Sequence, residues 1–175
     1  MPEGQGNKRN IDDIKAIGPD LLSEVNTIID KIRRGIKDGI IRINEIDTFL
    51  SQIVNREQRA SARRIFLADS GRCQEDNGYT ILHLLIDAYY RNPKKKADIL
   101  EDIKRILEMG CYPEYKNDYG ETALNLVIDW AKESDVDNTN IIELLLDYGA
   151  RIPSDLSFEQ TKLIRRIIKS KSGLV

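Results

Sequence analysis

The chain is poor in the residues that build most catalytic and metal centres. Its 175 residues include two cysteines and one histidine, too few for a disulfide framework or for a zinc site with four Cys and His ligands. It has no glycine-rich phosphate loop. No apolar run reaches the length of about 18 residues that a membrane span needs, and the polar N-terminus lacks the apolar centre of a secretory signal. We therefore expect a protein of a reducing compartment, without a cofactor or a metal.

Charge is nearly balanced overall but unevenly distributed. The formal net charge is −2. Residues 71–150 contain 9 basic and 16 acidic side chains, whereas residues 151–175 contain 6 basic and 2 acidic ones. The acidic middle segment argues against a nucleic-acid groove there, because phosphate binding relies on lysine and arginine. With 41% hydrophobic and 32% charged residues, the composition is that of a soluble globular protein.

One sequence frame, G-x-T-x-L-x-L-x-I-D, occurs twice. It begins at Gly78 in DNGYTILHLLIDA and again at Gly120 in NDYGETALNLVIDW, 42 positions later. A second pair, IKRILEMG and IIELLLDYG, aligns on Gly110 and Gly149. Each unit predicts a glycine turn, a threonine N-cap, two apolar helices and a left-handed glycine that ends the second helix.

These units resemble ankyrin repeats. NGYTILH at 77–83 is close to that family's G-x-T-P-L-H signature, and YGETALN at 119–125 is a weaker version with Asn125 in place of the histidine. The resemblance covers residues 72–153 and implies an inner helix, an outer helix and a hairpin in each repeat, with His83 making structural hydrogen bonds to the backbone. Ankyrin units run about 33 residues, so we expect the surplus residues, 90–98 and 132–140, to form exposed loops.

Two such units need helical neighbours on both sides to bury their apolar faces. Helices are predicted upstream at 19–36, 43–54 and 56–71. Downstream, residues 154–171 predict a helix with an apolar stripe and basic residues opposite; the stripe contains Phe158, Leu163, Ile164, Ile167 and Ile168. The pair at 43–71 is either a decayed repeat or an unrelated helical cap.

The sequence therefore predicts an all-α fold, a short ankyrin-like helical solenoid with an N-terminal helical cap and a C-terminal capping helix. The expected divisions are a flexible N-terminus (1–18), a helical cap or degenerate repeat (19–71), two repeats (72–113 and 114–153), and a capping helix with a tail (154–175). The basic helix at 162–171 also has the pattern of a membrane-surface helix. Because its apolar stripe is needed for capping, we expect no membrane partner, and the acidic middle segment leads us to expect no nucleic-acid partner.

Aromatic and acidic residues gather where ankyrin proteins vary. Tyrosine and tryptophan contribute much of the binding energy at protein interfaces when a rigid scaffold presents them. The alternative for Trp130 and some of the tyrosines is packing beneath the long insertions. The candidate protein-binding residues are Asn77, Tyr79, Tyr112, Tyr115, Asp118, Tyr119, Glu121, Asp129 and Trp130.

We expect a non-catalytic protein-interaction module, a regulator or a delivered effector, that presents a concave face and hairpin tips. The expected partner is a protein of basic or mixed charge with an apolar hot spot, bound by a monomer in the cytoplasm, or in a host cytosol if the protein is delivered. One alternative is an enzyme or modification factor with its chemistry in the N-terminal 70 residues, although Asp12, Asp13, Glu45 and Asp47 read as helix-surface acids. The other is a self-assembling structural piece.

Overall fold

The computed structural model describes residues 11–68, 77–131 and 138–173, and their regular structure is entirely helical. The all-α class is therefore confirmed for the described part of the chain. None of the described helices is long and apolar enough to cross a bilayer. The helices are α1 (Ile11–Ile17), α2 (Pro19–Lys37), α3 (Ile46–Leu50), α4 (Arg56–Ala68), α5 (Ile81–Arg91), α6 (Lys96–Glu108), α7 (Ala123–Ala131), α8 (Thr139–Asp147) and α9 (Phe158–Lys171), with the 3₁₀ turns η1 (Ile43–Glu45) and η3 (Pro93–Lys95).

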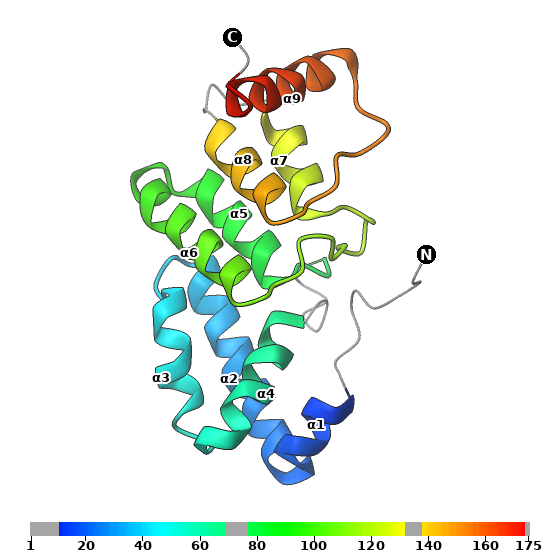
Figure 1. Ribbon diagram of the computed structural model, residues 1–175. Helices are drawn as coiled ribbons and strands as arrows, with labels where there is room; N and C mark the ends of the chain where they lie inside the picture. The colour runs from blue at the N-terminus through cyan, green and yellow to red at the C-terminus, as the bar shows by residue number, and fades with distance from the viewer. Residues whose placement is uncertain (1–10, 69–76, 132–137, 174–175) are drawn as a thin grey trace.

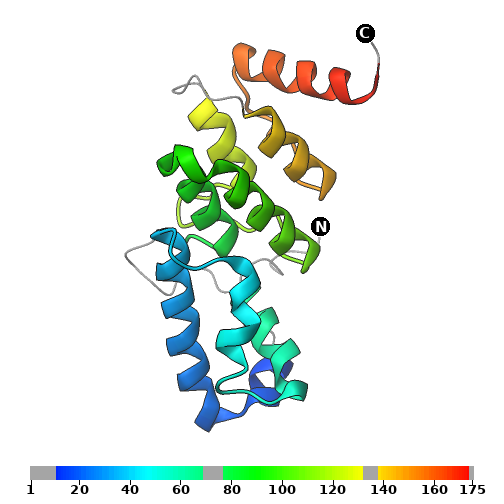
Figure 2. The ribbon, with the colours of Figure 1, turned by 90° about the vertical axis from the view of Figure 1, so that its left-hand side faces the viewer.

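The helices are stacked in tiers (Figures 1 and 2). Helices α1 to α4 form one end, the pairs α5–α6 and α7–α8 follow, and α9 lies across the other end. Helix α5 contacts α2 on one side and α7 on the other, while α9 contacts α8. One cluster of buried apolar side chains runs from Ile17 in α1 to Ile167 in α9, so the tiers share a core.

Helices α5 and α7 begin in the same way. At α5, the Thr80 side chain accepts a hydrogen bond from the His83 amide, and the His83 ring accepts one from the Thr80 amide at 3.2 Å. At α7, the Asn125 amide donates to Thr122 Oγ1 at 3.3 Å, and the Thr122 amide donates to Asn125 Oδ1 at 3.0 Å. The predicted threonine caps are confirmed, each closed by the side chain three residues later.

Helices α6 and α8 also end alike. Gly110 and Gly149 have φ angles of 95° and 89°. The amides of Gly110 and Cys111 donate to the carbonyls of Leu107 and Ile106, each at 3.0 Å, which is the Schellman arrangement. Gly149 and the residue after it repeat these bonds. The left-handed glycines predicted at these two positions are therefore confirmed.

The expectation of a flexible segment over residues 1–18 is wrong for residues 11–17, which form α1 and pack against α4 and α2. Asp13 was expected on a helix surface but is 4% exposed, because its Oδ1 accepts from Arg64 Nη2 at 2.6 Å. An ion pair that joins α1 to α4 holds this carboxylate inside.

The exposed loop expected over residues 90–98 is mostly helical. Helix α5 continues to Arg91, and Pro93 begins the turn η3, which leads directly into α6. Pro93 fits there because the first residues of a helical turn need no amide donor. Of the other predicted insertion, residues 132–137 lie outside the described residues, and Thr139 and Asn140 begin α8.

The predicted capping helix forms, but its apolar stripe is only partly buried. Ile164 and Ile167 are 3% and 2% exposed, whereas Phe158 is 80% and Ile168 43% exposed. The expectation that Phe158 and Ile168 lie on the buried stripe is therefore wrong. Phe158 is the first residue of α9, six residues before Ile164, which puts it on the opposite side of the helix from the buried pair.

The N-terminal tier is joined to the next one by α2 and by the segment after it. Arg33 of α2 is 1% exposed and donates to the carbonyl of Tyr79. Arg42, just before η1, binds the buried carboxylate of Asp102 in α6, with Nε and Oδ2 2.6 Å apart. These contacts hold the tier in place as either a cap or a decayed repeat would, and both interpretations of residues 43–71 stay open.

Candidate functional site

Two turns from different parts of the chain lie side by side at the starts of α5 and α7. The Asp118 amide donates to the carbonyl of Asn77 at 2.9 Å, and the Tyr119 hydroxyl donates to Asn77 Oδ1 at 3.2 Å. Gly78 has a φ of 69°, and a Cβ built on it would lie 2.8 Å from the Asp118 amide nitrogen. Only glycine therefore allows both the left-handed turn and the close approach of the second turn.

The second turn is held by one buried side chain. Asn117, 6% exposed, accepts hydrogen bonds on Oδ1 from the amides of Tyr119 and Glu121 at 3.0 and 2.9 Å. Its Nδ2 donates to Glu121 Oε2 at 2.8 Å, and its backbone amide donates to the Glu121 carbonyl at 2.9 Å. Asn117 was not among the predicted site residues. An asparagine three residues before a glycine was the available signal, because asparagine side chains commonly bond to the amides that follow them in turns.

His83 connects the two turns from beneath. Its Nδ1 accepts from the Thr80 amide, so the ring proton lies on Nε2, which donates to the carbonyl of Glu121 at 3.0 Å. The side chain is fully buried. Burial lowers the pKa of His83 to about 4, since the imidazolium form would lose its solvation; the hydrogen bond to Glu121 opposes that shift and the nearby Arg33 charge adds to it. The ring is a neutral structural link at pH 7.

Five of the predicted site residues therefore share one surface, which we call the tip surface: Asn77, Tyr79, Asp118, Tyr119 and Glu121. Tyr119 is 68% exposed, and Asn77 and Asp118 are also exposed. The ring of Tyr79 is half-buried, with its centroid 5.4 Å from that of His83, and burial raises the pKa of its hydroxyl. The two carboxylates beside Tyr119 give this surface an acidic and aromatic character.

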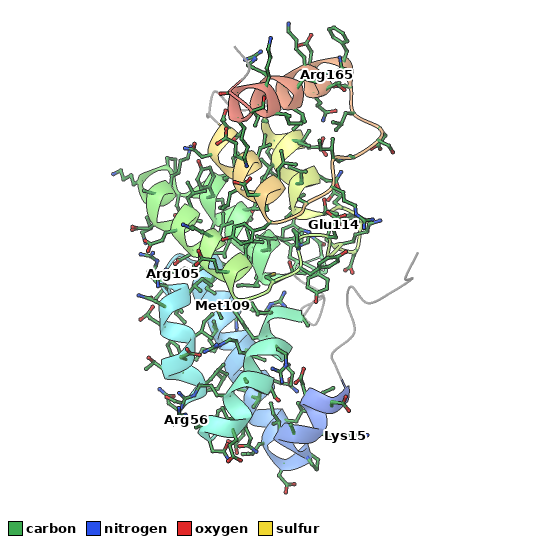
Figure 3. The ribbon with its side chains drawn as sticks, in the orientation of Figure 1. Lys15, Arg56, Arg105, Met109, Glu114 and Arg165 are labelled. Carbon is green, nitrogen blue, oxygen red and sulfur yellow. The ribbon has the colours of Figure 1, made fainter. Side chains whose placement is uncertain are left out.

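Tyr112 and Tyr115 lie on the loop from α6 to the tip surface. Their rings meet edge to face with centroids 5.5 Å apart, and Tyr112 is 47% exposed while Tyr115 is half-buried. Glu114, between them, accepts from the Arg151 amide at 2.8 Å and so fixes this loop to the chain after α8 (Figure 3). The pair forms a second aromatic spot on this loop.

Asp129 and Trp130 do not belong to the tip surface. They lie at the far end of α7, about 10 Å along the helix axis from its start. The half-buried Trp130 ring meets Tyr90 edge to face at 5.0 Å, and Asp129 Oδ1 accepts from Gln160 Nε2 of α9 at 3.0 Å. Both side chains therefore take part in packing between elements, the alternative that was left open for Trp130.

Reactive groups are scarce in the described residues. Burial raises the pKa of the Cys111 thiol to about 12, so this cysteine is an unreactive core residue. Cys73 lies outside the described residues. Within residues 11–68, 77–131 and 138–173, no group of three or more His, Cys, Asp or Glu side chains is placed to hold a metal ion. The features that define the tip surface are therefore its hydrogen bonds and exposed side chains, and not reactive groups.

No family model, curated protein or solved structure matches this chain.

Proposed function

We propose that the protein is a non-catalytic interaction module that binds a protein partner through the tip surface. The observation that carries the proposal is the locking of the two turns, in which Asn77 holds Asp118 and Tyr119 while His83 holds Glu121. A surface fixed in this way loses little conformational entropy on binding. Its exposed tyrosine and flanking acids suit a partner of basic or mixed charge with an apolar hot spot.

We also propose that the helix pairs are ankyrin-like repeats in a short solenoid. Three equivalences support this. The glycine turns at Gly78 and Gly120 have φ angles of 69° and 78°, Thr80 and Thr122 cap the first helix of each pair, and left-handed glycines end both second helices. His83, as the family resemblance implies, binds backbone groups rather than a ligand.

The contacts of the N-terminal acids favour this proposal over an enzyme with its chemistry there. Asp13 is buried against Arg64. Asp47 pairs with Arg63 at 2.5 Å, and Glu45 Oε2 accepts from the Arg42 amide at 2.7 Å. These carboxylates are engaged in joining helices and capping a turn. Replacing Asp13 by Asn should therefore lower the stability, and binding should be retained by the fraction that is folded.

Capture experiments with a substituted tip surface test the proposal. The purified full chain is incubated with lysates of candidate cells, and captured proteins are compared among wild type, Tyr119→Ala and Ile40→Ala. Ile40 is 76% exposed and precedes η1, away from the tip surface, which makes it a matched control. Tyr119→Ala is expected to lose a protein that wild type and Ile40→Ala both retain. The affinity should fall tenfold or more, because a central tyrosine contributes on the order of 2 kcal/mol to the free energy of binding.

A crosslinking arm locates the contact directly. A photoreactive aromatic residue at position 119 should crosslink to the captured protein, whereas the same residue at position 40 should not. Identical capture by Tyr119→Ala and wild type would show that the tip surface is not the binding site. Light scattering at increasing concentration tests the self-assembly alternative, since we propose a cytoplasmic monomer and association of the chain would contradict it.

A further inference from the structure

Helix α9 has a row of cations on the side that faces away from the rest of the molecule. Lys162, Arg165, Arg166 and Lys169 are spaced i, i+3, i+4 and i+7, so they share one helix face, and all four are exposed. Figure 3 shows Arg165 at the outer end of the stack. None of the four makes an ion pair with a described residue, whereas Lys171, at the end of the helix, pairs with Asp147.

Phe158 belongs to the same face. It lies four residues before Lys162 and seven before Arg165, and its side chain is 80% exposed. The opposite face is already used, because Ile164 and Ile167 are buried against the preceding tier. We call Phe158, Lys162, Arg165, Arg166 and Lys169 the basic face. Capping the core therefore explains one side of α9 and leaves the basic face without a structural role.

The shape of the basic face narrows the class of partner. It is the outer side of one helix and consists mainly of long, flexible cations, with one exposed acid, Glu159, beside them in the first turn. Lysine is depleted in protein–protein interfaces, where anchor residues fill well-packed pockets. A fluid anionic surface needs no matching shape, and an exposed aromatic ring beside lysine and arginine is typical of peripheral membrane contacts. A nucleic-acid backbone would use the cations but would leave Phe158 unexplained.

Charge distribution supports the same partner. The C-terminal residues 151–175 have 6 basic and 2 acidic side chains, and residues 71–150 have 9 and 16. Since α9 lies across the end of the stack (Figure 2), an anionic surface would attract this end and repel the acidic tiers behind it. The molecule would meet the surface end-on, with the tip surface on its side.

We propose that the basic face docks reversibly on a membrane surface containing anionic phospholipids. The headgroups bind the four cations, and Phe158 enters the interface between headgroups and acyl chains. This replaces, for α9, the expectation of no membrane partner, because that expectation placed Phe158 in the buried stripe. The proposal is independent of the tip surface, and α9 lies on the membrane without crossing it.

Vesicle co-sedimentation of the full chain tests the proposal. The probes are phosphatidylcholine vesicles with and without phosphatidylserine, at low and at physiological salt. Wild type should bind only the vesicles that contain phosphatidylserine and should be released by salt. The double variant Arg165→Gln with Arg166→Gln should reduce partitioning by roughly tenfold or more. Phe158→Ser should weaken binding several-fold while every charge is retained.

The control removes two charges at the opposite end of the stack. Lys15 and Arg56 are exposed on α1 and α4 (Figure 3), so Lys15→Gln with Arg56→Gln should bind vesicles as wild type does. Circular dichroism and thermal melting should show that all variants fold. The proposal is overturned if wild type ignores phosphatidylserine, if both double variants lose binding equally, or if a DNA duplex binds with the same dependence on the two arginines while vesicles do not.

Discussion

At the scale of single residues, the histidine shows how burial determines a protonation state. His83 must stay neutral because Nδ1 accepts the Thr80 amide while Nε2 donates to Glu121. Protonation would remove the acceptor and place a cation near the buried Arg33. The ring of Tyr79 also lies beside that of His83, and burial outweighs the opposing hydrogen bond to the Glu121 carbonyl, so the pKa of His83 is lowered.

We predict that this residue makes the folded state less stable in mild acid. Its pKa falls from 6.5 to about 4 on folding, so the unfolded chain binds the proton more tightly. The contribution of the neutral His83 ring to the free energy of unfolding is complete above pH 6.5. It is lost as the pH falls toward 4, by up to about 3 kcal/mol. Urea unfolding at several pH values measures it. His83→Asn, which copies the cap made by Asn125, should remove this part of the dependence of the unfolding free energy on pH. An unchanged pH dependence would exclude His83 as its source.

The two turn glycines should differ in their tolerance of a side chain. Gly78→Ala combines a left-handed φ with a Cβ 2.8 Å from the Asp118 amide nitrogen, so we expect a loss of about 3 kcal/mol or more in unfolding free energy. Gly120→Ala has the strained φ of 78° but no atom within 4 Å, which predicts about 1–2 kcal/mol. Thermal and urea unfolding compare them, and equal losses would contradict the close approach of the turns.

At the scale of helices, the contribution of an ion pair that joins two elements depends on how deeply its carboxylate is buried. Asp102 of α6 is 2% exposed, and Arg42 reaches it through two nitrogens at 2.6 and 3.2 Å. Asp47 of α3 is half-exposed where it meets Arg63 of α4. A buried carboxylate that loses its partner keeps its desolvation cost, whereas an exposed one is solvated again.

Arg42→Met should therefore cost about 2 kcal/mol of unfolding free energy, and Arg63→Met less than about 1 kcal/mol. Urea denaturation of the two variants gives both values under the same conditions. Adding Asp102→Asn to Arg42→Met should recover part of the larger loss, because the unpaired charge is removed. If Arg63→Met proves the more damaging change, the ranking by burial is wrong.

At the scale of the whole molecule, the continuous core predicts that the tiers unfold together. Buried side chains from α1 to α9 form one cluster, and α5 packs against α2 of the tier before it and α7 of the tier after it. The chain has a single tryptophan, Trp130 in α7. Its fluorescence reports the third tier, while circular dichroism reports all helices.

We predict coincident denaturation curves by these two probes. Phe66→Leu in α4, a fully buried position, should lower both midpoints by the equivalent of about 1 kcal/mol, although it is far from Trp130 along the chain. A fluorescence transition that does not move when the circular dichroism transition does would mean that the N-terminal helices unfold as a separate unit.

The sequence predicted helix ends well where they depend on hydrogen bonds between residues close together in the chain. The caps at Thr80 and Thr122 and the left-handed Gly110 and Gly149 depend on bonds within a few residues, and the pattern of residues contains them. The prediction was wrong for residues 90–98, because Pro93 was taken as a loop signal and also suits the first turn of a helix. The prediction was also wrong for residues 11–17, because this short helix lacks the long apolar pattern by which a helix is predicted.

The sequence alone thus determined the helical class, the repeated turn-and-helix units and most helix ends, since these follow from hydrophobic periodicity and hydrogen bonds between near neighbours. Only the tertiary structure decided which side chains face solvent together. It brought Asn77 to Tyr119, buried Asp13 against Arg64, packed Trp130 on Tyr90 and left Phe158 outside. Such placements depend on contacts between residues distant in the chain, which a one-dimensional pattern does not encode.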